Sequence, residues 1–128
     1  NMSYENIKKI SEEYLIYLTD IGFTLDILKP MFRFDSTNPI YSIELYKENS
    51  EEFNWEEIKY DFIPFIEFIS EKYIIDDISL YLGNPYMSKM HISLPFSGGR
   101  SVSVNDILDD KSSMRFIKDI KSIKIRVR

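Results

Sequence analysis

Two long segments of the chain carry apolar residues at the three- and four-residue spacing of an amphipathic helix. The first covers residues 7–21 and ends before Gly22, which suits the left-handed position that follows a helix. The second covers residues 54–72. Asn54 stands in its capping position and Glu57 follows three residues later, as in a capping box. The spacing therefore predicts two helices, one near the start of the chain and one in its middle.

The second predicted helix is apolar on almost all sides around Pro64. Proline removes a backbone donor, so we expect a kink there; the alternative is that Pro64 lies in the first turn of a separate helix capped by Asp61. A helix lying on a sheet buries only one stripe, so some of its other apolar residues need a second surface, namely Ile63, Phe65 and Phe68. That surface is either the loop of residues 28–40 or another protein molecule.

Alternation of apolar and polar residues predicts the strands. It occurs over residues 23–27, 41–46, 78–82, 90–94 and 123–128. The first two of these segments form one predicted hairpin, and the turn-rich residues 83–85 join the next two in a second hairpin. Between residues 97 and 120 we expect a turn, a short strand at 102–104 and a short helix capped by Asn105 or Asp106.

The resulting order of elements is α-β-β-α-β-β-(β)-α-β. It predicts an α+β fold, a mainly antiparallel sheet with two to three helices packed on it in a two-layer sandwich. The chain of 128 residues has the length of one domain and shows no linker or repeat, so we expect a single domain over residues 1–128. Asn1 precedes Met2, which indicates a remnant of an expression tag.

Rare and absent residue types reduce the number of functions that the chain could perform. The chain contains one histidine and no cysteine, whereas acid–base, nucleophilic and zinc chemistry near neutral pH depend on these types. The single histidine, His91, has no residues near it in sequence that would both orient it and offer it a group to activate. We therefore expect a protein that is not an enzyme and that needs no cofactor.

Two groups of aspartates are the candidates for a divalent cation site, Asp76-Asp77 and the cluster of Asp106, Asp109 and Asp110. Neither has the glycine and the spaced ligands of a calcium loop. A helix start and a solvated strand end account for them, so we expect no metal site.

The absence of cysteine and of any apolar run of about 18 residues favours a cytoplasmic protein without a membrane partner. Isoleucine occurs 20 times, whereas alanine and glutamine are absent, which is the pattern that AT-rich coding sequences produce. In these respects the chain resembles the small proteins of bacteriophages and other mobile elements. That resemblance implies the host cytoplasm as its location.

Charge is unevenly distributed along the chain, whose formal net charge is −5. Residues 1–88 carry 17 acidic and 7 basic side chains, and residues 89–128 carry 4 acidic and 9 basic ones. Either the two surfaces neutralise each other in one fold, or they are separate faces for different partners.

The acidic residues are densest between Glu44 and Asp61, with aromatic residues among them. Such a stretch is either a solvated face or a surface that docks on a basic protein. Together with the apolar positions of the second helix, it gives the candidate partner-binding residues Tyr46, Phe53, Trp55, Glu56, Ile63, Phe65 and Phe68.

A second set of residues could bind an anion. The loop residues Ser97, Gly98, Gly99 and Arg100 would offer backbone N–H groups and a guanidinium, although a glycine pair also makes an ordinary hairpin turn. On the last strand, Lys124, Arg126 and Arg128 share one face. These residues either bind phosphates, or form a charged edge that prevents strand addition, or pair with acidic neighbours. The strand itself has no aromatic residue on which a base could stack.

These observations predict a small non-catalytic interaction protein, a phage or mobile-element accessory factor. It would dock on a host or viral protein through its acidic aromatic surface and form an oligomer through its second helix. The alternative is a nucleotide- or nucleic-acid-binding module that uses residues 97–101 and the basic last strand, although the acidic net charge makes nucleic acid the less favoured partner. An enzyme using His91, Arg100 and the aspartates is the third hypothesis.

Overall fold

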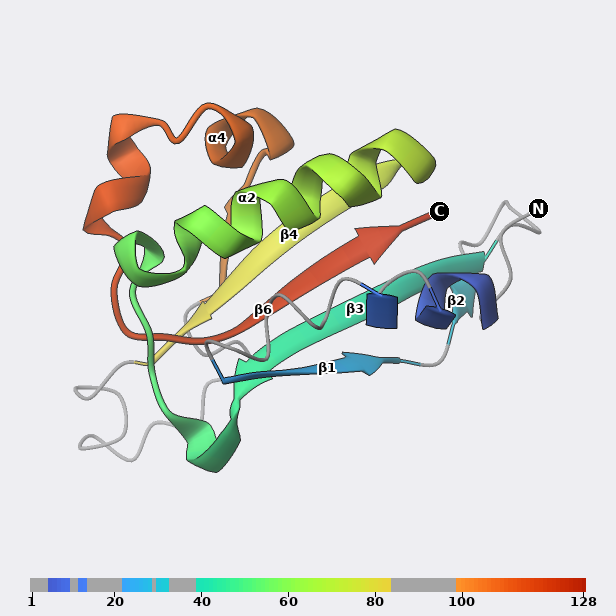
Figure 1. Cartoon of the computed structure of the whole chain (residues 1–128), viewed down its shortest axis with the longest axis horizontal. Helices are drawn as coiled ribbons and strands as arrows, with labels where there is room; N and C mark the ends of the chain where they lie inside the picture. Colours follow the sequence, from blue (N-terminus) through green and yellow to red (C-terminus); the bar gives the residue numbers. More distant parts are fainter. Residues whose placement is uncertain (1–4, 10–11, 14–21, 29, 33–38, 84–98) are drawn as a thin grey trace.

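The strands of the protein form one antiparallel sheet, which dominates the computed structural model (Figure 1). The structure describes residues 5–9, 12–13, 22–28, 30–32, 39–83 and 99–128. The strands are β1 (Phe23–Ile27), β2 (Met31–Phe32), β3 (Pro39–Lys47), β4 (Ile75–Leu82), β5 (Gly99–Val102) and β6 (Ile120–Val127). The helices are α2 (Trp55–Lys72), α4 (Val104–Leu108) and the short 3₁₀ elements η1 (Glu48–Ser50) and η2 (Ser112–Phe116), and residues 5–9 are also helical.

Strand order across the sheet differs from strand order along the chain. The order in space is β1-β3-β6-β4-β5, with β2 paired to the first residues of β3, and every neighbouring pair is antiparallel. β6 therefore lies at the centre of the sheet, between β3 and β4. The predicted α+β class with a mainly antiparallel sheet is confirmed.

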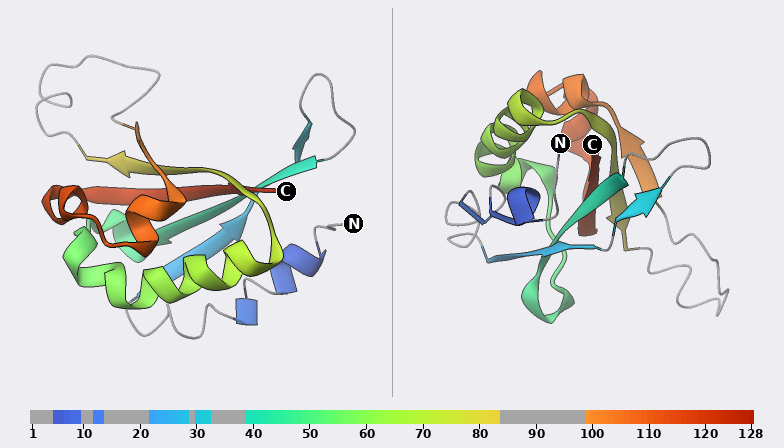
Figure 2. Two further views of the ribbon diagram at one scale, coloured as in Figure 1. Left: turned by 90° about the horizontal axis from the view of Figure 1, so that it is seen from above. Right: turned by 90° about the vertical axis from the view of Figure 1, so that its right-hand side faces the viewer.

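The helices lie on one side of this sheet. Seen from above, α2 and the helical residues 5–9 are on the same side of the strands, and β2 extends on the other (Figure 2). α4 packs against α2 and β4. We call the side under α2 the covered face, and the opposite side, on which no helix of the described residues lies, the open face.

Alternation along the strands builds the core on the covered face. In β6, Ile123, Ile125 and Val127 are each 0% exposed, while the residues between them point to the open face. α2 places its apolar stripe on these strands through Trp55, Ile58, Phe62, Phe65, Ile66 and Ile69, all of them buried. Full burial of an aliphatic or Phe side chain contributes about 1.5–3 kcal/mol, so this layer stabilises the fold.

α2 is one helix that runs through Pro64. The alternative of a separate helix starting at Pro64 with Asp61 as its cap is therefore wrong. Proline has no N–H, so the carbonyl of Tyr60, four residues earlier, lacks its usual helical donor.

The start of α2 is held differently from the expected capping box. Asn54 occupies the capping position, but its side chain makes no capping hydrogen bond. Its carbonyl accepts the backbone N–H of Glu57 at 3.2 Å, and the N–H of Trp55 donates to the carbonyl of Ile117 at 3.1 Å. The first turn of α2 is thereby tied to the segment that follows η2.

The pairing predicted for β4 is wrong. β4 pairs with β5 over Ile78–Tyr81 and with β6 on its other side, so its hairpin partner is β5 and not residues 90–94. Residues 90–94, including His91, lie outside the described residues. One of the alternatives for the basic last strand, that it is a charged edge strand, is also wrong, because β6 has a neighbour on both sides.

The segment between β5 and β6 also differs from its prediction. The strand expected at 102–104 lies at Gly99–Val102, and Ser103 caps the short helix in place of Asn105 or Asp106. The Ser103 hydroxyl accepts the N–H of Asp106 at 3.0 Å, and the Asp106 carboxylate accepts the N–H of Ser103 at 3.0 Å. This reciprocal capping box satisfies two donors that the helix would otherwise leave open.

Candidate binding surfaces

Polar side chains cover the open face in regular cross-strand rows. Cross-strand register places its side chains in three rows: Thr24-Tyr46-Ser122-Tyr81-Gly99, Asp26-Glu44-Lys124-Ser79-Ser101 and Ser42-Arg126-Asp77. In each row the β3 and β6 residues differ in size or in charge: Tyr beside Ser, Glu beside Lys, and Ser beside Arg. This face is polar, in contrast to the apolar covered face.

Of the three basic residues on the last strand that were predicted to bind an anion, two pair with aspartates. Arg126 forms an ion pair with Asp77, and the Arg128 Nε lies 2.7 Å from the Asp76 Oδ1. Both aspartates come from β4, so the acidic first part of the chain neutralises these two charges inside the fold.

Lys124 behaves differently from the two arginines. Its cross-strand neighbours are Glu44 on β3 and Ser79 on β4, and its Nζ lies 5.1 Å from the centre of the Tyr81 ring. Glu44 forms no ion pair with any described residue. A cation and a carboxylate that are neighbours in register therefore remain separate on the open face.

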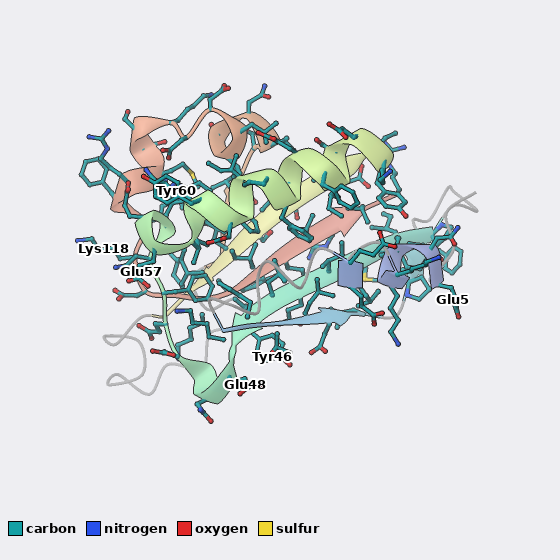
Figure 3. All side chains as sticks on the ribbon, viewed as in Figure 1. Glu5, Tyr46, Glu48, Glu57, Tyr60 and Lys118 are labelled. Atoms are coloured by element: carbon teal, nitrogen blue, oxygen red, sulfur yellow. The ribbon has the colours of Figure 1, made fainter. Side chains whose placement is uncertain are left out.

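Tyr46, a predicted partner-binding residue, lies on the open face among carboxylates. Its hydroxyl donates to the Asp26 Oδ2 at 2.8 Å. This hydrogen bond, together with partial burial and the negative charges of Asp26, Glu44 and Glu48, raises the pKa of Tyr46 above its ordinary value of 10.0. Tyr46 and Glu48 lie at the same end of β3 (Figure 3).

Three other predicted partner-binding residues lie in the core. Phe53, Trp55 and Phe65 are 1%, 0% and 0% exposed, so the prediction that they form a docking surface is corrected. Ile63 and Phe68 are half-buried and pack against the same core. The apolar residues of α2 that were expected to need a second surface are therefore covered largely by the protein's own core. An oligomer contact through Phe65 would require this core to open.

Asp110 fixes the first turns of α2 to the segment between α4 and η2. Its Oδ1 accepts the Trp55 Nε1–H at 2.8 Å, and its Oδ2 accepts the Lys59 Nζ at 2.9 Å. These bonds, the one from Trp55 first, hold the pKa of Asp110 below its ordinary 3.8. The Lys59 Nζ also lies 2.9 Å from the Glu56 Oε2, and its bonds to Glu56 and Asp110 raise the pKa of Lys59 above the ordinary 10.5.

Two aromatic side chains extend from this fixed end of the molecule. Tyr60 on α2 is 76% exposed, and Phe116 at the end of η2 is 74% exposed. The acidic residues Glu56 and Glu57 are exposed on the same turns of α2. Figure 3 shows Glu57, Tyr60 and Lys118 at one end of the molecule. We call Tyr60 and Phe116, with Glu56 and Glu57, the aromatic platform.

The sequence analysis missed both aromatic residues of the platform. Tyr60 does not share the three- and four-residue spacing of the buried residues of α2, so its exposure could have been predicted from the sequence. Phe116 gave no signal, because η2 has too few residues to show a period.

Of the predicted anion loop, Ser97 and Gly98 lie outside the described residues. Gly99 and Arg100 belong to β5, opposite Tyr81 and Leu80 of β4. The part of this segment that the structure describes is therefore a paired strand.

Four of the five aspartates in the two clusters have protein partners, namely Asp76, Asp77, Asp106 and Asp110. Asp106 caps α4 and lies 3.1 Å from the Lys111 Nζ, and hydrogen bonds from Ser103 and Lys111 lower its pKa below 3.8. Within the described part of the chain, no three acidic or histidine side chains gather as a metal site would require. No helix in that part is both long and apolar enough to cross a membrane.

The structure thus defines an α+β protein with two candidate surfaces, the aromatic platform and the open face. Comparison of the chain with protein families, with curated proteins and with solved structures gave no match. The functional argument therefore rests on the two surfaces.

Proposed function

We propose that the protein is a non-catalytic binding protein that docks on a partner protein through the aromatic platform. The observation that carries the proposal is the exposure of Tyr60 and Phe116, at 76% and 74%, beside core aromatics that are almost fully buried. Large exposed aromatic side chains supply much of the binding energy at protein interfaces.

The platform is held in place before any partner arrives. Asp110 bonds to both Trp55 and Lys59, and the Trp55 N–H bonds to the carbonyl of Ile117, the residue after Phe116. Fixing the two elements in advance reduces the entropy lost on binding. This supports a docking role for the aromatic pair.

The charges beside Tyr60 favour a partner with basic groups around an apolar pocket. Glu57 forms no ion pair with any described residue, and Glu56 shares Lys59 with Asp110. The acidic aromatic surface expected from the sequence is thus retained with Tyr60 in place of Trp55. An accessory role in a phage or mobile element is part of this proposal and rests on composition.

Site-specific photo-crosslinking tests the proposal. Benzoylphenylalanine is placed at position 60, at position 116 or, as a matched control, at position 74, because Ile74 is 56% exposed just beyond the other end of α2. We expect the same partner to be crosslinked from positions 60 and 116 and not from position 74. With that partner purified, Tyr60→Ala or Phe116→Ala should weaken binding at least about tenfold, and Ile74→Ala should not.

Equal crosslinking from all three positions, or unchanged affinity in both alanine variants, would contradict the proposal. Thermal unfolding of each variant checks that the fold is intact.

A second candidate function is the binding of single-stranded nucleic acid on the open face. Tyr46 and Tyr81 flank the strand that carries Lys124 and Arg126, and such an arrangement of aromatic and basic residues can stack bases. The neighbouring strands supply the aromatic residues that β6 lacks. The carboxylates of Asp26, Glu44 and Asp77 on the same face oppose a polyanion, so this function ranks second.

Its test is a titration with a labelled mixed-sequence oligonucleotide at several salt concentrations. Binding through this face should weaken steeply with salt and should be lost in Tyr81→Ala and Lys124→Gln. Salt-independent binding, or none, would eliminate the candidate.

A further inference from the structure

We propose that two copies of the chain associate through their open faces, about a two-fold axis that runs along the strands between β3 and β6. The aromatic platform belongs to the helical layer on the opposite side of the sheet, so this association is independent of the proposed function. The partner is a second copy of the same chain because the open face is complementary to itself.

The complementarity follows from the three cross-strand rows of polar side chains on the open face. A two-fold axis between β3 and β6 lays β3 of one copy over β6 of the other and keeps each row opposite itself. The facing pairs are then Tyr46 with Ser122, Glu44 with Lys124 and Ser42 with Arg126, each formed twice. Each row joins a large residue to a small one or an acid to a base.

The charges of the middle row are available for such a contact. Glu44 and Lys124 are cross-strand neighbours within one chain, yet no ion pair joins them, and the Lys124 Nζ lies over Tyr81 instead. Among the described residues neither side chain has an ion-pair partner. In the dimer each would face an opposite charge on the other copy.

The centre of the open face permits close approach, whereas β2, paired with the first residues of β3, extends on this side at its margin (Figure 2). Small residues lie on this face in β3, β6, β4 and β5, at Ser42, Ser122, Ser79, Gly99 and Ser101. Ser42 and Ser79 are themselves only 5% and 9% exposed, because they lie between larger side chains of the face. Face-to-face sheets pack about 10 Å apart with their strands within about 30° of each other, which small residues allow. Solvent still reaches this face, since the Arg126 and Asp77 side chains are 32% and 31% exposed.

The size of the face sets the strength of the contact. With the axis between β3 and β6, β1 lies over β4 and β5 has no strand opposite it, so four strands of each copy meet. At a spacing of about 4.8 Å these strands are about 15 Å across, and three rows of that width bury less than the roughly 800 Å² per partner of a standard interface. We therefore expect a reversible dimer whose dissociation depends on both protein concentration and salt.

Charge reversal tests the geometry by sedimentation velocity over a range of protein concentrations. Wild type should show a dimer at high concentration. Glu44→Lys and Lys124→Glu each place like charges at two symmetry-related contacts, so each should raise the dissociation constant at least about tenfold. Glu71→Lys, on the exposed side of α2, is the matched control and should leave association unchanged.

The decisive sample is an equimolar mixture of the two variants. A dimer of one Glu44→Lys copy with one Lys124→Glu copy restores an acid–base pair at both contacts, so the mixture should associate although each variant alone does not. Circular dichroism and thermal unfolding establish that both variants are folded.

Three results would overturn the proposal. They are a wild type that stays monomeric at millimolar concentration, a dimer that neither reversal weakens, and a mixture that stays monomeric although both variants are folded. A monomer that binds an oligonucleotide through Lys124 would assign the open face to nucleic acid instead.

Discussion

The two faces of β6 show how one alternating segment serves two purposes. Its odd-numbered residues Ile123, Ile125 and Val127 are completely buried under the helical layer, while Lys124 and Arg126 lie between them on the open face. The covered face is apolar and is closed by the protein itself. The open face is polar and is not covered by the helical layer, so the association proposed for it should be alterable without changing the fold.

The largest expected effect comes from testing this separation within β6. Ile125→Ala should lower the free energy of unfolding by about 3–4 kcal/mol, because it leaves a cavity among fully buried side chains. Lys124→Ala, one residue away on the open face, should change it by less than about 1 kcal/mol. Urea denaturation of both variants measures the difference, and similar losses would show that the open face also maintains the fold.

A smaller effect is expected where the helical layer depends on a polar link. Asp110→Ala leaves the Nε1–H of Trp55, a 0% exposed residue, without its acceptor, which should cost about 2 kcal/mol. Asp110→Asn keeps an acceptor for Trp55 and should cost less. Asp109→Ala, at the exposed neighbouring position, is the control for urea denaturation. Equal stability of wild type and Asp110→Ala would mean that apolar packing alone holds α2.

The smallest expected effect is the loss of folding stability at low pH. The folded pKa values of Asp106 and Asp110 lie below the ordinary 3.8, so these groups bind protons more readily when the chain is unfolded. Their contribution to stability is complete well above pH 3.8 and is lost as pH falls through the lower folded values. Unfolding free energy should therefore decrease below about pH 5 and less steeply in Asp110→Asn. An identical slope in both proteins would contradict this role for Asp110.

Local signals allowed much of the fold to be predicted. Alternation identified β1, β3 and β6, and helical spacing identified α2, because each pattern is contained within one element. The strand order was not predictable from such patterns, since β6 joins β3 and β4 through contacts between residues far apart in sequence. The hairpin assigned to residues 78–82 and 90–94 was wrong for that reason.

The binding surfaces were harder to predict than the fold. Phe53 and Trp55 lie in an acidic stretch and therefore suggested a surface, but the register of α2 and the bridge of Phe53 to Ile120 bury them. Composition describes a segment as a whole, whereas burial depends on which side of each residue faces the sheet. The open face likewise combines residues from separate strands, so neither its rows nor its tyrosine pair is visible in any one segment.

The central place of β6 has a consequence for how the protein is made. During synthesis β3 and β4 emerge from the ribosome long before residues 120–127, yet the strand that lies between them is β6. The apolar sides of β3 and β4 therefore have no complete sheet to join until β6 itself is available. Such non-local pairing slows folding and leaves the nascent chain prone to aggregation, so this protein should depend on protection by chaperones until β6 inserts.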